Sequence, residues 1–133
     1  MTTNAQTAPA VSNSLEAWLP VVGRVLIAAI FILSGISKIT DPASAMAYIS
    51  SVGLPLPAVA LAAAIVVELV GGALLIVGYR VRTVAVVIAL FSVATAVFFH
   101  NNLADQNQFI HFFKNIAIAG GLLQIVAFGK ARG

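Results

Sequence analysis

The 133-residue chain contains no cysteine. It can therefore form no disulfide, bind no iron-sulfur cluster through its own thiolates and run no thiol chemistry. Any redox role would need a bound cofactor or a partner protein. The sequence also has no Walker loop, Rossmann glycine pattern, zinc signature or nucleophile elbow. We therefore interpret its glycines as residues that let helices pack closely.

Charged residues are scarce as well. They make up 8% of the chain, whereas 61% of the residues are hydrophobic. Soluble domains have about 25% charged and about 45 to 50% apolar residues, so the composition predicts a membrane protein. The formal net charge is +3, but the basic residues lie near the ends of apolar runs. Insertion topology accounts for basic residues in such places, so we expect a lipid bilayer and no nucleic acid as partner.

Four apolar runs are long enough to cross a bilayer, since a spanning helix needs about 20 residues. The fold class is therefore predicted to be all-α, an integral membrane bundle of four transmembrane helices. The predicted spans are residues 18–39, 58–78, 83–99 and 109–128. Residues 1–17 lack the charged start and cleavage site of a secretory signal and predict a disordered tail before a single domain, 18–133.

A short helix is expected between the first and second spans. Asp41 followed by Pro42 is typical of a helix start, with the aspartate as N-cap. Residues 43–52 are too few and too mixed to span, so they predict a helix lying at the membrane interface and ending near Gly53. Only residues 79–82 join the second span to the third, which predicts antiparallel neighbours.

The basic residues also predict the orientation. Lys38 and Lys114 lie toward one face of the membrane, and five basic residues lie toward the other. The five are Arg24, Arg80, Arg82, Lys130 and Arg132. Because the cytoplasmic side carries the excess of Lys and Arg, both termini are predicted to be cytoplasmic.

Glu68 is the most informative residue, because it lies near the middle of the second span. An ionised carboxylate at that depth costs about 3 kcal/mol, so we expect it to be neutral, paired or hydrated. Ala60, Ala64, Gly71 and Gly72 share its helix face and form a small-residue strip that lets a neighbouring helix approach. Glu68 is predicted to act in catalysis; the structural alternative is packing and pairing.

Two basic residues on the first span are candidates to act together with Glu68. Arg24 and Lys38 are fourteen residues apart and share an interior stripe with Phe31 and Gly35. We predict an ion pair between Arg24 and Glu68 and a catalytic role for both; the alternative is that Arg24 reaches the headgroups. For Lys38, ligand binding inside the bundle and an outward orientation are both open.

The predicted outer end carries the densest polar group. Its candidate ligand-binding residues are His100, His111, Lys114 and Asn115, together with Lys38. Imidazole, amide and ammonium groups could hydrogen-bond the carbonyl of a quinone or another small oxygenated ligand. The alternative is a polar cap hydrated by water, which is the simpler reading for His100 alone. Two histidines at a wet helix end give little support to haem, and no metal site is predicted.

The order of these residues resembles the DoxX family. Its first half is similar to Gly23-Arg24-Val25-Leu26, Ser34-Gly35-Ile36-Ser37-Lys38, Asp41-Pro42 and Gly53-Leu54-Pro55. The second half is similar to Glu68 with Gly71-Gly72, His100-Asn101, His111-Phe112-Phe113-Lys114-Asn115 and Gly120-Gly121. The resemblance covers about Pro20 to Phe128 and implies a multi-pass protein of the bacterial inner membrane.

The family is named for a subunit linked to thiosulfate:quinone oxidoreductase, and members are often described as candidate oxidoreductases. One mycobacterial relative is reported in a membrane complex with superoxide dismutase and a sulfurtransferase. The resemblance therefore implies a membrane subunit of a redox or detoxification system, with quinone as candidate cofactor and a soluble redox protein as candidate partner. The sequence leaves open a non-catalytic carrier for a hydrophobic compound or lipid, a structural partner subunit, and a homo-oligomer.

Overall fold

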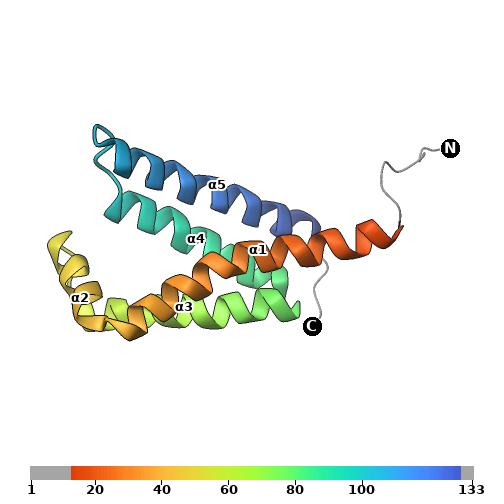
Figure 1. The fold of residues 1–133 in the computed structure, drawn as a ribbon, viewed down its shortest axis with the longest axis horizontal. Helices are drawn as coiled ribbons and strands as arrows, with labels where there is room; N and C mark the ends of the chain where they lie inside the picture. The colour runs from red at the N-terminus through yellow and green to blue at the C-terminus, as the bar shows by residue number, and fades with distance from the viewer. Residues whose placement is uncertain (1–12, 130–133) are drawn as a thin grey trace.

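The computed structural model of the protein describes residues 13–129. Five helices follow one another without a strand in this part of the chain (Figure 1). They are α1 (Asn13–Thr40), α2 (Pro42–Ser51), α3 (Pro57–Val77), α4 (Val81–Phe99) and α5 (Gln106–Phe128). The four long helices are apolar and long enough to cross a membrane. The predicted all-α bundle of four transmembrane helices with a short intervening helix is confirmed.

The start of α1 differs from the sequence prediction. Residues 13–17 were expected to belong to a disordered tail, but α1 begins at Asn13. Glu16 lies in the first turn, where a negative charge interacts favourably with the helix dipole, so the helix extends beyond the apolar run. The rest of the expected tail, residues 1–12, lies outside the described residues.

The predicted start of α2 is confirmed. The Asp41 side chain accepts a hydrogen bond from the Ser44 backbone N–H at 3.2 Å, and Pro42 occupies the first turn. The side-chain and backbone hydrogen bonds with Ser44 lower the pKa of Asp41. The chain leaves α2 through Gly53, whose φ of +85° is a conformation that favours glycine. A capped ten-residue helix is therefore fixed at one end of the bundle.

The long helices associate as two pairs. α1 packs along α3 and α4 packs along α5, while the contact between α3 and α4 is smaller. Gly72 allows the first pair to approach closely, since a β-carbon there would lie 2.7 Å from Ile32 Cγ1. In Figure 1 the two pairs diverge toward the end that carries α2. We call this the α2 end.

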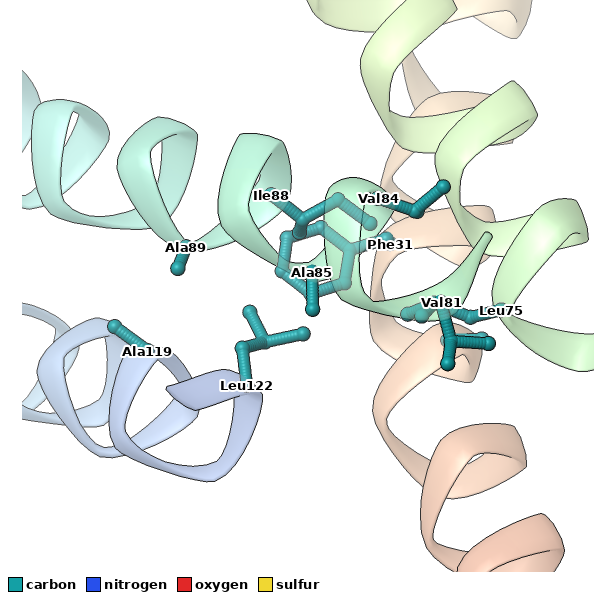
Figure 2. Packing of buried hydrophobic residues seen from close by; sticks show 10 residues of the cluster. Phe31, Leu75, Val81, Val84, Ala85, Ile88, Ala89, Ala119 and Leu122 are labelled. Atoms are coloured by element: carbon teal, nitrogen blue, oxygen red, sulfur yellow. The ribbon is translucent and has the colours of Figure 1, made fainter. Parts of the chain in front are cut away.

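The apolar core lies nearer the opposite end, around the α3–α4 connection (Figure 2). Leu75, Val81, Ile88 and Leu122 are fully buried there. Most other large apolar side chains are exposed on the outer faces of the helices, as expected for surfaces that face lipid. The core therefore holds the two helix pairs together at one end and leaves space between them at the other.

Candidate functional site

A cavity of about 480 Å³ lies between the helix pairs at the α2 end. Its wall is mostly apolar and includes Phe31 of α1, Ala60 and Ala64 of α3, and Phe91 and Phe98 of α4. The predicted small-residue strip of α3 thus has two roles. Gly71 and Gly72 are buried against neighbouring helices, as expected for close packing. Ala64 and Ala60, about two and three turns earlier, line the cavity instead, because α4 has already diverged from α3 there.

Glu68 and Lys38 form an ion pair on the cavity wall. Lys38 Nζ lies 3.0 Å from Glu68 Oε1 and donates a hydrogen bond to Oε2 at 3.1 Å. The Ser34 hydroxyl lies one turn before Lys38, donates to the same Oε2 at 3.0 Å and accepts from Lys38 Nζ at 2.9 Å. The side chain of Glu68 is 5% exposed and that of Lys38 is 25% exposed. The carboxylate is therefore buried in the wall, while the Lys38 side chain stays partly exposed.

The predicted pair between Arg24 and Glu68 is wrong. Arg24 Nε donates instead to the carbonyl oxygen of Leu75 at 2.8 Å, in the last turn of α3. Carbonyls at a helix C-terminus lack intrahelical partners, so this guanidinium caps α3. Seven residues separate Leu75 from Glu68, about 10 Å along the helix. Since α1 and α3 are antiparallel, Lys38 reaches Glu68 and Arg24 lies at the other end, outside the cavity wall.

A second polar group joins α4 to α5. The Asn115 side-chain amide donates to Thr95 Oγ1 at 2.8 Å and to the carbonyl oxygen of Ser92 at 3.4 Å. Asn115 lines the cavity, and its role in ligand binding stays a prediction. Three further polar residues line the cavity that were not expected from the sequence: Ser34, Ser92 and Thr95. Only their spacing in the sequence marked them. Ser34 lies one turn before Lys38, and Ser92 and Thr95 lie one turn apart on α4.

The histidines lie at the rim. His100 follows the last turn of α4 and lines the cavity, and its ring stacks on that of His111 with centroids 5.1 Å apart. Burial lowers the pKa of His100, and the charges of His111 and Lys114 lower it further. His111 and Lys114 are exposed and do not belong to the cavity wall. The structure thus brings Lys38, His100 and Asn115 to the cavity, whereas His111 and Lys114 lie outside it.

Tyr48 connects α2 to α4, although nothing in the sequence suggested it. Its hydroxyl donates to the carbonyl oxygen of Phe99 at 3.1 Å, and the two rings lie 5.1 Å apart. Tyr48 also lines the cavity. α2 therefore closes part of the mouth between the diverging helix pairs. Over residues 13–129, no three His, Asp or Glu side chains are grouped so that they could hold a metal ion.

Four apolar helices around a cavity whose wall carries an ion pair define a multi-pass membrane protein with a polar interior site. The DoxX family model matches residues 19–101. Inner membrane protein YqjF of Escherichia coli (strain K12) is 36% identical over 111 residues, which cover 81% of this chain and 82% of that protein. Inner membrane protein YphA of the same strain is 30% identical over 116 residues, covering 84% and 83%. The chain belongs to the DoxX family.

These relatives and the four apolar helices make the chain a multi-pass inner membrane protein. The matched range contains Arg24, Lys38, Glu68 and His100 and ends before His111. No solved structure matches the chain significantly. The orientation of the termini remains a prediction from the basic residues.

Proposed function

We propose that this protein is the membrane subunit of a DoxX-type redox or detoxification system and binds a quinone or similar small amphipathic molecule in its cavity. One observation carries the proposal: the buried Glu68 and the partly exposed Lys38 form an ion pair on the wall of an otherwise largely apolar cavity of about 480 Å³. Small-molecule sites are typically cavities of about 300 to 1,000 Å³ with apolar walls and a few convergent polar groups. Ionisable groups inside a membrane are costly and usually mark a functional site.

The cavity residues suit a ring with oxygen substituents. Phe31, Phe91 and Phe98 offer aromatic surface, and the alanines of α3 leave room for a planar group. The partly exposed Lys38 side chain brings a positive charge that attracts a ligand carbonyl oxygen, and the amide oxygen of Asn115, on the opposite wall, can accept from a ligand hydroxyl. In this role the chain holds and orients the ligand. A soluble redox protein docked on the membrane would exchange electrons with it.

The two ends of the bundle have different tasks in this proposal. The excess of basic residues supports cytoplasmic termini, and with that orientation the α2 end and the cavity mouth lie at the outer face. The cap that Arg24 forms on α3 then stabilises the cytoplasmic half, where the core lies. Ligand exchange takes place at the outer half, where the helix pairs diverge.

Mass spectrometry of organic extracts tests the proposal. The protein is purified from bacterial membranes in mild detergent as wild type, as Ala64→Phe, which fills the cavity, and as the matched control Val66→Phe. Val66 lies on the same helix but is 58% exposed on the outer surface. We expect a stoichiometric quinone in the wild type and the control and its loss in Ala64→Phe.

Bulk lipid alone, in equal amounts from all three proteins, would contradict quinone binding. A different hydrophobic compound, retained by the wild type and the control but lost in Ala64→Phe, would favour the non-catalytic carrier. Circular dichroism of each variant shows whether the helices remain folded.

A further inference from the structure

Lys114 carries a positive charge that no acidic side chain of the chain balances. It is exposed on α5 and makes neither a side-chain hydrogen bond nor an ion pair with any residue from 13 to 129. The sequence has four acidic residues, and all four lie within this range. They occupy the first turn of α1 (Glu16), the N-caps of α2 and α5 (Asp41 and Asp105) and the ion pair with Lys38 (Glu68). A counter-ion for Lys114 therefore has to come from another molecule.

The position of Lys114 along α5 places it inside the membrane. α5 has 23 residues, and about 20 residues of helix cross the hydrocarbon core. Counted back from Phe128, this crossing begins near Phe109, so the Cα atom of Lys114 lies about 7 to 8 Å inside the core. The aliphatic stem of a lysine can extend toward the interface, which brings the ammonium to the level of the lipid phosphates. A cation at such a depth is costly unless an anion accompanies it.

Two histidines next to Lys114 add to the positive character of this surface. His111 lies three residues earlier on the same helix and is exposed, and its ring stacks on that of His100 with centroids 5.1 Å apart. The charges of His111 and Lys114 both contribute to the lowered pKa of His100. An ammonium only donates hydrogen bonds, and an imidazole N–H donates whether or not the ring is charged. His111 and Lys114 thus offer an anion both positive charge and hydrogen-bond donors.

The apolar surface beside Lys114 favours a lipid over a free anion. Phe109 and Phe113 are about half exposed, and their ring centroids lie 4.9 Å apart. Ile110, one turn before Lys114, is also half exposed. None of these three side chains lines the cavity. A phospholipid can bring its phosphate to Lys114 and lay its acyl chains on this apolar surface, whereas a free anion would bind only the charged groups.

We propose that Lys114 and His111 bind the headgroup of an anionic phospholipid, such as phosphatidylglycerol, on the outer surface of α5 at the α2 end. The lipid phosphate accepts hydrogen bonds from the Lys114 ammonium and the His111 imidazole. A zwitterionic lipid also has a phosphate, but its own cationic group offsets that charge, so it gains less from this site. The inference is independent of quinone binding, because both residues lie outside the cavity wall.

Photocrosslinking that compares an anionic with a zwitterionic lipid tests the inference. The full-length protein is reconstituted in phosphatidylcholine vesicles with a trace of phosphatidylglycerol or phosphatidylcholine, each carrying the same diazirine on an acyl chain close to the glycerol. Peptide mass spectrometry then measures the label on residues 109–117 from each probe. One basic residue near the membrane surface corresponds to about a fivefold preference for an anionic lipid, so we expect the anionic probe to give about five times more label.

Variants connect this preference to the charge of Lys114. Lys114→Gln should give equal labelling by the two probes, whereas Lys114→Arg should keep the preference because it keeps the charge. His111→Ala removes one donor and should lower the preference in part. Arg80→Gln is the matched control: Arg80 is exposed next to the α3–α4 connection, at the opposite end of the bundle, so its loss should leave the labelling of residues 109–117 unchanged. Circular dichroism shows whether each variant keeps its helices.

Three results would overturn the inference. Equal labelling of the wild type by both probes would show that Lys114 extends to the interface without binding an anionic lipid. A preference that persisted in Lys114→Gln would show that another part of the protein selects the lipid. Loss of the preference when inorganic phosphate replaces chloride at constant ionic strength would show that a free anion occupies the site.

Discussion

Substitutions that break the Lys38–Glu68 ion pair should reveal strong energetic coupling between the two side chains. At an effective dielectric constant of about 20, two unit charges 3.0 Å apart attract by about 5 kcal/mol. Much of this offsets the loss of hydration, but removing one partner leaves the other charge unpaired and costs about 3 to 5 kcal/mol. Lys38 is 25% exposed, so the lower end of that range applies. Lys38→Met or Glu68→Gln alone should therefore lower the free energy of unfolding by about 3 kcal/mol.

The double variant Lys38→Met/Glu68→Gln should lose no more than either single variant, because it leaves no buried charge unpaired. The coupling energy from the cycle is then about 3 kcal/mol. Unfolding by SDS titration in mixed micelles, followed by circular dichroism, gives the four free energies. Lys114 provides the control: it is exposed and lies off the cavity wall, so Lys114→Met and Glu68→Gln should be additive. Additive effects of the Lys38 and Glu68 variants would refute the ion pair.

Three further predictions concern packing, α2 and pH. Gly72→Ala should lower the free energy of unfolding by about 1 to 3 kcal/mol, because its β-carbon would lie 2.7 Å from Ile32 Cγ1. Gly120→Ala should raise the free energy of unfolding by about 0.5 to 1 kcal/mol, because nothing lies within 4 Å of the added β-carbon. If SDS titration gave the same change for both variants, the close contact between α1 and α3 at Gly72 would be contradicted. Tyr48→Phe removes the hydrogen bond to the Phe99 carbonyl, so amide exchange should accelerate in α2 and remain unchanged in α3. Equal protection of α2 in both proteins would show that this hydrogen bond does not hold α2 against α4. The pKa of His100 is lowered in the folded protein, so the unfolded chain binds more protons and stability should decrease as the pH falls below about 6.5. In the His100→Asn variant, the free energy of unfolding measured by chemical denaturation should decrease less between pH 7 and pH 5 than in the wild type. Equal decreases in both proteins would show that His100 does not cause the pH dependence.

The helices could be predicted from the sequence because apolar run length decides whether a segment can span a membrane. The start of α2 was also predictable, since an N-cap is a local interaction between Asp41 and Ser44. The interior position of Glu68 followed from its place in an apolar run. These features depend on residues close together in the chain or on composition alone.

The partner of Glu68 was not predictable, because two cations share one face of α1 and the register between α1 and α3 decides which one reaches it. That register depends on tertiary contacts, such as Gly35 against Leu69 and Gly72 against Ile32. The cavity could not be predicted from the sequence for a similar reason. A strip of small residues predicts close approach, but only the divergence of α4 shows that Ala60 and Ala64 face space rather than a helix. Tyr48 carries no sequence signal at all, since its partner is a backbone carbonyl.

Photoaffinity labelling can show directly whether a quinone-class ligand occupies this cavity. The wild-type protein in nanodiscs is irradiated with a short-chain azidoquinone, and the labelled residues are identified by peptide mass spectrometry. We expect labels on cavity residues such as Phe31, Ala64 and Phe98, and we expect excess trimethylhydroquinone to suppress them. Labels confined to exposed surface residues such as Leu26, Val66 and Leu90, and unaffected by the competitor, would contradict it.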